Sequence, residues 1–192
     1  RQQTVVTSLG VCQTYRSSAG NCPSTTSSTV GSNRSNQNSS SFYVGDTINY
    51  YLVINNPTSS AINNIALSYN LNSNISVASS TANFSGCGSS PSFTGSGNSI
   101  SLNGISVAAP TSGNVNGICT VTISVKATAV GTWGSTINAN TITGPTISNV
   151  QSNSVNLSAN NPLSITQAFS PTTAGLYGNS VLKMTLSNAS SN

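Results

Sequence analysis

The chain lacks histidine and glutamate altogether, and its single acidic residue is Asp46. Charged residues make up 3% of the 192 residues, whereas about a quarter is usual in globular proteins. Without histidine or a second carboxylate, the sequence cannot supply a Ser-His-Asp triad, a pair of catalytic carboxylates or an ordinary zinc site. We therefore expect a protein that is not an enzyme and that holds no metal and no cofactor.

Basic residues are also few, and they are scattered singly as Arg1, Arg16, Arg34, Lys126 and Lys183. Nucleic-acid-binding domains gather such residues on one face, so the formal charge of +4 reflects the missing acids. No apolar run approaches the roughly 18 residues of a membrane-spanning helix. The sequence thus argues against nucleic-acid binding and membrane insertion.

Apolar residues make up 35% of the chain, and they recur in short alternating runs between turns rich in Gly, Asn and Pro. One run, Thr47 to Ile54, begins after a Gly-Asp turn and ends at Asn-Asn-Pro; which of its faces is buried stays open. In Cys119 to Ala127, apolar and polar residues alternate strictly. Further strands are expected at 61–71, 75–78, 99–102, 105–108, 136–143 and 152–158. This spacing predicts an all-β, immunoglobulin-like antiparallel β-sandwich.

Four cysteines in a chain without histidine favour two disulfides over a metal site. Paired as Cys12–Cys22 and Cys87–Cys119, they would each stabilise the fold by about 3 kcal/mol. Disulfides form in oxidising compartments, so we expect a secreted or cell-surface protein.

The chain divides into three parts by composition. Residues 1–41 hold an N-terminal strand, the first disulfide loop and a polar linker, and residues 42–160 form the sandwich. Residues 161–192 start again with two strands, 163–169 and 181–186. The segment from Gly178 repeats the glycine-to-asparagine distance of the segment from Gly45. We interpret residues 161–192 as the first strands of an incomplete second module, since two strands cannot bury a core alone.

Several motifs together resemble the tandem Ig-like conserved-repeat modules of bacterial cell-surface proteins, a domain family of unknown function. They are F-S-P-T-T, G-N-S-V-L-K-M-T-L-S-N, G-C-G at Gly86 to Gly88, S-I-S-L-N-G, and G-I-C-T-V-T-I-S-V-K-A-T-A-V-G-T. The resemblance covers 42–144 and, as a partial copy, 163–188. It implies a disulfide between Cys87 and Cys119, and it implies extracellular structure and adhesion rather than a defined chemistry. The acidic position that the family has between its early strands is missing here.

Other motifs have a plain structural alternative. Ser180 and Lys183 match S-x-x-K, but in a strand they point to opposite faces. A Lys–Asn isopeptide bond would need Asp46 as its buried acid, and a turn position for Asp46 is the better interpretation. Four tyrosines form either a sugar-binding face or part of the core: Tyr43, Tyr50, Tyr51 and Tyr69. The candidate glycosylation sites are Asn33, Asn38, Asn74, Asn83, Asn156 and Asn188.

An N-terminal β-run on a polar linker, together with an incomplete module, resembles strand donation between subunits. The candidate donor strand consists of Thr4, Val5, Val6, Thr7, Ser8 and Leu9. The candidate acceptor edge consists of Val181, Leu182, Met184 and Leu186. The sequence thus predicts the subunit of a surface filament whose partners are copies of itself. The alternatives are a segment of a monomeric multi-repeat adhesin that binds glycans, matrix or other cells, and a fragment of a longer repeat protein.

Overall fold

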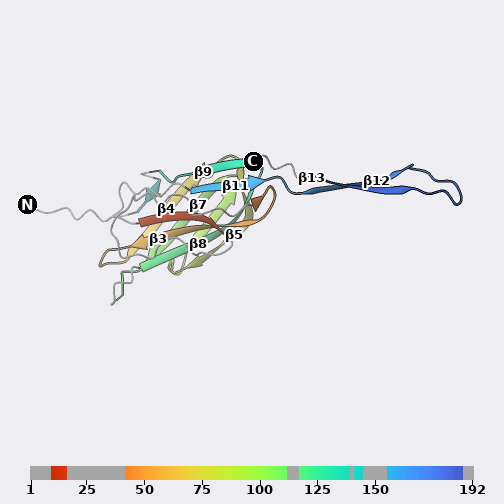
Figure 1. Ribbon diagram of the computed structural model, residues 1–192. Helices are drawn as coiled ribbons and strands as arrows, with labels where there is room; N and C mark the ends of the chain where they lie inside the picture. The colour runs from red at the N-terminus through yellow and green to blue at the C-terminus, as the bar shows by residue number, and fades with distance from the viewer. Residues whose placement is uncertain (1–9, 17–41, 112–116, 139–140, 145–154, 188–192) are drawn as a thin grey trace, which may run out of the picture.

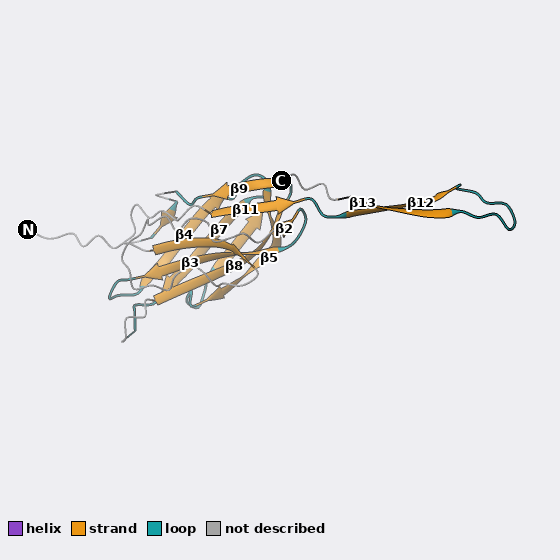
Figure 2. Cartoon of the chain, in the orientation of Figure 1, coloured by secondary structure: helices purple, strands orange, loops and turns teal. Residues whose placement is uncertain are grey.

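A computed structural model describes residues 10–16, 42–111, 117–138, 141–144 and 155–187. These residues form strands and no helix (Figures 1 and 2). The strands are β1 (Gly10–Arg16), β2 (Phe42–Tyr43), β3 (Ile48–Asn56), β4 (Ile62–Asn70), β5 (Ile75–Ser85), β6 (Ser92–Ser96), β7 (Ser99–Val107), β8 (Gly117–Ala127), β9 (Gly131–Ser135), β10 (Ile142–Thr143), β11 (Val155–Asn160), β12 (Ser164–Ser170) and β13 (Val181–Ser187). The predicted all-β class is confirmed.

Two four-stranded antiparallel sheets enclose the core. One has the strand order β1-β3-β8-β5 and the other β10-β4-β7-β6, while β2, β11 and β9 form a smaller sheet. In the smaller sheet β2 runs parallel to β11, and β9 runs antiparallel to it. Side chains from all three sheets join one apolar cluster, so this arrangement fits a β-sandwich.

The buried face of β3 carries Ile48, Tyr50, Leu52 and Ile54. These residues share the core with every second residue of β8, from Cys119 to Ala127. The alternation predicted for β8 is therefore confirmed, and the question of which β3 face is buried is answered. Trp133 packs against the edge of this cluster, and its indole N–H donates to the Ala129 carbonyl oxygen at 3.1 Å.

Some strands differ from the sequence predictions. The expected strands 99–102 and 105–108 are one strand, β7, and β5 runs on to Ser85. Strand β6 was not predicted, because its sequence S-F-T-G-S has one large apolar residue. It pairs with β7 across the two-residue Gly97-Asn98 connection, which is typical of a tight hairpin.

Residues 136–143 are not one strand as predicted. Strand β9 ends at Ser135, and the two-residue β10 begins at Ile142. The N-terminal region also differs, since β1 occupies Gly10–Arg16 and pairs along its whole length with β3. A strand therefore lies where the sequence suggested the start of a disulfide loop.

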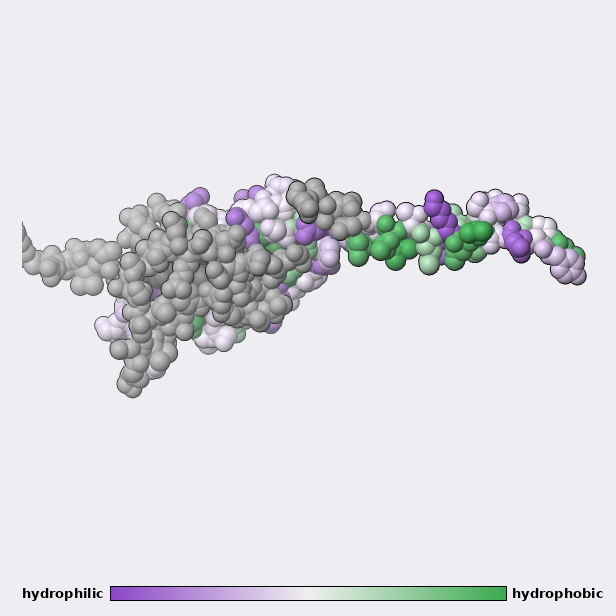
Figure 3. Space-filling view, in the orientation of Figure 1, coloured by the Kyte–Doolittle hydropathy of each residue, from purple (hydrophilic) through white to green (hydrophobic). Residues whose placement is uncertain are grey.

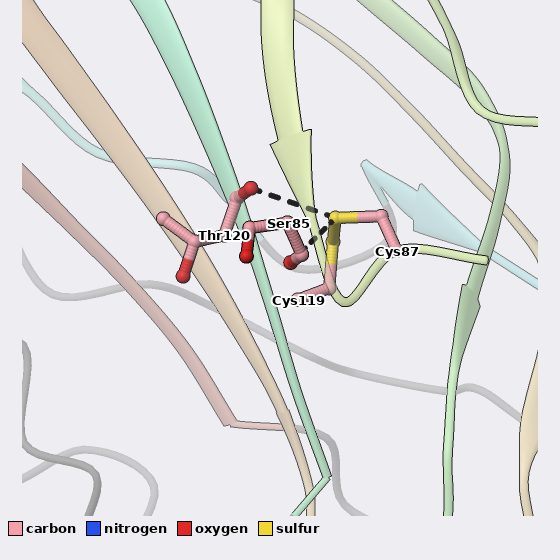
Figure 4. The surroundings of a disulfide bond; sticks show 4 residues. All are labelled: Ser85, Cys87, Cys119 and Thr120. Carbon is pink, nitrogen blue, oxygen red and sulfur yellow. Dashed lines mark hydrogen bonds between the residues drawn. A yellow bond between two sulfur atoms is a disulfide. The ribbon is translucent and has the colours of Figure 1, made fainter.

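The predicted bond between Cys87 and Cys119 is present and joins positions 32 residues apart (Figure 4). The turn before it requires glycine, because Gly86 has a φ of +70° and a Cβ there would lie 2.2 Å from the Ile118 carbonyl oxygen. Cys87 Sγ lies 3.3 Å from the Ser85 oxygen and 3.6 Å from the Thr120 oxygen. A disulfide sulfur has no hydrogen to donate, so these are packing contacts. Cys22 lies outside the described residues, and the Cys12–Cys22 pairing stays a prediction.

Candidate assembly interface

Strands β12 and β13 form a hairpin that projects from the sandwich as a two-stranded ribbon (Figure 1). The cross-strand pairs Ile165–Leu186, Gln167–Met184 and Phe169–Leu182 place their side chains on one face. The opposite face carries Ser164, Thr166, Ala168, Ser170, Val181, Lys183, Thr185 and Ser187. The ribbon therefore has an apolar face, interrupted by Gln167, and a mostly polar face. We call the first of these the apolar ribbon face.

The apolar ribbon face has no cover among the described residues. Ile165 is 69% exposed, Leu186 65% and Phe169 56%, and Figure 3 shows hydrophobic surface, in green, along the projecting ribbon. A two-stranded hairpin is marginally stable in water unless further strands or another layer cover its apolar side. The exposed apolar side chains therefore make this ribbon the candidate interaction surface.

The tip of the hairpin exposes two more large side chains, Leu176 and Tyr177. They lie in a turn closed by a hydrogen bond from the Gly178 N–H to the Gly175 carbonyl oxygen at 2.7 Å. Tyr177 has a φ of +66°, a region that L-residues other than Asn and Asp rarely occupy. The turn thus presents a leucine and an aromatic ring to solvent at the end of the ribbon.

Strand β1 is attached to the sandwich by a buried polar contact as well as by its ladder with β3. Gln13 is 1% exposed. Its side-chain N–H donates to the Ser135 carbonyl oxygen at 2.8 Å, and its Oε1 accepts from the Tyr50 hydroxyl at 2.7 Å. The Tyr50 hydroxyl also contacts that of Tyr69. Gln13 therefore connects β1 to β3 and β9, and through Tyr50 to β4.

The hairpin and the start of β1 lie at opposite ends of β3. Gly10 pairs with Asn55, near the last residue of β3. The hairpin follows Asn160, whose carbonyl oxygen accepts from the Val44 N–H just before the first residue of β3. These two points are separated by the length of the strand, about 25 Å at the usual rise. The chain therefore enters β1 at one end of the sandwich and extends the ribbon from the other.

The four residues of the predicted acceptor edge all lie in β13 and are exposed, but they do not share a face. Leu182, Met184 and Leu186 belong to the apolar ribbon face, whereas Val181 lies on the other side. The predicted donor strand, Thr4 to Leu9, lies outside the described residues. Its role stays a prediction.

The remaining candidate residues are placed as follows. Asn83 is exposed on β5, while Asn74 and Asn156 are partly buried; the other three sequons lie outside the described residues. Tyr50 and Tyr51 are buried in the sandwich, Tyr69 is partly buried and Tyr43 is exposed. The four tyrosines therefore do not form one exposed face.

Two further predictions are answered by local contacts. Asp46 is a turn residue, because its N–H donates to the Tyr43 oxygen and its Oδ2 accepts from the Tyr43 N–H, both at 3.1 Å. The Ser180 hydroxyl donates to the Pro171 carbonyl oxygen at 2.6 Å. Ser180 lies before the first residue of β13, so the prediction that Ser180 and Lys183 share a strand is wrong.

Sequence reasoning missed the β12 side of the apolar ribbon face and all of the Gln13 contacts. The spacing of Ile165 and Phe169 indicated a strand, but only the cross-strand register shows that they share a face with Leu182 and Leu186. Gln13 has no sequence signal, because the groups that bind it come from β3 and β9.

Among the described residues, no group of His, Cys, Asp and Glu side chains could hold a metal ion. None of these residues forms a helix long and apolar enough to cross a membrane. No protein-family model matches the chain, and no curated protein matches it. The resemblance to bacterial repeat modules therefore stays a prediction.

Proposed function

We propose that this chain is the structural subunit of an extracellular surface filament, with an immunoglobulin-like sandwich as its body. Copies associate head to tail, and β-strands of one copy complete the sheet of the next. The observation that carries the proposal is the apolar ribbon face, which projects from one end of the body and lacks a cover among the described residues.

The chemistry of the ribbon favours another copy of the chain as its partner. No charged residue lies on the apolar ribbon face, and the one charge in the hairpin, Lys183, lies on the opposite side. A lipid surface gains only about 1 kcal/mol from one lysine, and a nucleic acid needs a cluster of basic residues. A second copy brings β-rich surface with few charges, and hence little electrostatic repulsion.

The positions of β1 and the hairpin favour a filament over a closed dimer. Because β1 starts at one end of the sandwich and the ribbon leaves from the other, contacts between them are heterologous. Heterologous contacts form open polymers when the rotation between copies does not close a ring. The buried disulfide fits an oxidising, extracytoplasmic location.

The test removes the apolar ribbon face while keeping the body. In the variant Phe169→Ser with Leu182→Ser, one cross-strand pair of that face becomes polar. We expect the unaltered chain to form long particles in negative-stain microscopy and the variant to sediment as a monomer. The matched control is Ala168→Ser with Val181→Ser on the opposite face, which should polymerise normally. If the Phe169 and Leu182 variant polymerises like the unaltered chain, the proposal is wrong.

The exposed tip of the hairpin favours a second candidate function, a segment of a monomeric adhesin. Leu176 and Tyr177 are the two most exposed large hydrophobic residues among those described, and aromatic rings are common anchors in binding sites. A reproducible glycan-array signal that disappears in Tyr177→Ser, from a chain that stays monomeric, would favour the adhesin over the filament.

A further inference from the structure

The position of β1 along β3 is not set by a tight turn between the two strands. In a hairpin, the length and type of the turn set the register of the two strands. Strand β1 has no such turn, because Arg16 and Ile48 are separated by residues 17–47. Among the described residues, the contacts around Gln13 are side-chain contacts that can hold this register.

The site that receives Gln13 is specific for a primary amide side chain. The contacts described include an acceptor, the Ser135 carbonyl oxygen, and a donor, the Tyr50 hydroxyl, at 2.8 and 2.7 Å from the two ends of the amide. We call these two groups the Gln13 socket. A slip of two residues would bring Val11 or Tyr15 to this position. Valine has no polar group, and a tyrosine hydroxyl cannot reproduce a planar amide, so the register with Gln13 in the socket is preferred.

The connection between β1 and the rest of the body is long. Residues 17–41 supply 25 residues between β1 and β2, and an extended chain of this length reaches about 80 Å. A sandwich of this size has a radius of gyration of only about 15 Å. The connection is therefore long enough for β1 to pair with β3 of its own chain or with β3 of a neighbouring copy.

Given the filament proposed above, we propose that β1 of one copy seats beside β3 of a second copy, with Gln13 in the second copy's socket setting the register. The partner is thus another molecule of this chain, and the slot beside β3 is the receiving site. Seven residue pairs between β1 and β3 and the two Gln13 hydrogen bonds are the same whether β1 comes from its own chain or from the neighbour. Such an exchange joins two copies through the same contacts that β1 and β3 make within one chain. The register of β1 on β3 then sets the distance between successive sandwiches.

The experiment uses cysteine pairs across β1 and β3 in the full chain. Arg16 pairs with Asn49, so the variants Arg16→Cys and Asn49→Cys are purified separately, given different tags and mixed before assembly. We expect a disulfide between the two differently tagged chains on a non-reducing denaturing gel. If the chains never cross-link, while the double variant forms its bond within one chain, β1 exchange is wrong.

Microscopy of the same samples separates this inference from the filament itself. Polymers without a bond between chains overturn β1 exchange and leave the filament standing. A bond between chains in discrete dimers supports exchange and overturns the filament, and monomers without such a bond overturn both.

The role of Gln13 is tested by measuring which residues of β1 and β3 lie opposite each other, and not by measuring the stability of the fold. In Gln13→Leu and in Tyr50→Phe, which keeps the buried ring, we expect the Arg16–Asn49 cross-link to fall at least several-fold. A cross-link from Arg16→Cys to Thr47→Cys, two residues along, should rise in return. Ser135→Ala is the matched control because it keeps the main-chain acceptor, and its register should stay unchanged. An unchanged register in both Gln13→Leu and Tyr50→Phe would show that the socket does not set it.

Discussion

The side-chain amide of Asn56 donates a hydrogen bond to the Ala108 carbonyl oxygen at 2.9 Å and so links the end of β3 to the end of β7. The same amide donates to the Ser60 oxygen at 2.8 Å, while its Oδ1 accepts from the Thr58 N–H at 3.0 Å. Asn56 is completely buried. One side chain thus connects the two large sheets and closes the turn that ends β3.

We expect Asn56→Ala to lower the free energy of unfolding by about 2–3 kcal/mol, because the buried Val107 carbonyl oxygen, 3.2 Å from the Asn56 amide, loses a donor in a place with little access to water. Asn63→Ala on the exposed face of β4 is the control and should change stability by less than about 0.5 kcal/mol. Urea unfolding followed by tryptophan fluorescence measures both. Equal midpoints for the two variants would contradict the structural role given to Asn56.

Gly86→Ala should destabilise the fold more than Gly97→Ala. Comparing the two variants separates backbone strain at a positive φ from a steric clash of the added Cβ. Both glycines have a positive φ, +70° and +56°, but a Cβ at Gly86 would lie 2.2 Å from the Ile118 oxygen, whereas one at Gly97 meets nothing within 4 Å. Backbone strain alone costs about 1–2 kcal/mol, and we expect this loss for Gly97→Ala. Gly86→Ala must also move backbone beside the disulfide, so its loss should be clearly larger. Similar losses in urea unfolding would show that the turn relaxes freely.

The body was predictable from sequence where local pattern and tertiary environment agree. From Cys119 to Ala127, strand β8 alternates strictly, and the apolar residues of this stretch all face the core. Strand β3 was harder, because Tyr51 is also buried although it lies on the opposite face from Tyr50. Alternation alone could not choose between its faces.

The candidate interface was predictable only in part. The acceptor residues of β13 were identified from their similarity to the segment after Gly45, but Val181 lies on the opposite face from the other three. The face on which each of these residues lies depends on how β12 pairs with β13. The two strands are joined by ten residues, 171–180, and a connection of this length has no fixed turn type. The Gln13 socket depends on contacts between residues 122 positions apart, which no local pattern reveals.

Removing the disulfide by Cys87→Ala with Cys119→Ala should lower the free energy of unfolding by about 3–4 kcal/mol. The bond closes a span of 32 residues, and the chain-entropy model gives this value for a loop of that size. Urea unfolding of the oxidised chain and the double variant measures the difference. Reductant should lower the stability of the unaltered chain much more than that of the variant. A variant as stable as the oxidised chain would show that β5 and β8 hold this region without the bond.

Assembly through the apolar ribbon face should not weaken when salt is added. That face carries no charge, and at about 1 M salt, where the Debye length is about 3 Å, contacts between charges would be largely screened. We therefore expect the polymer fraction, measured by sedimentation, to stay constant or rise with added salt.

Gln167→Lys places a charge in the middle of the apolar ribbon face, so burying that face against another copy becomes costly. We expect this variant to polymerise poorly at low salt. Thr166→Lys puts the same charge on the opposite face of the ribbon and should polymerise like the unaltered chain. Equal losses in the two lysine variants would indicate that charge anywhere on the hairpin, and not cover of the apolar ribbon face, controls assembly.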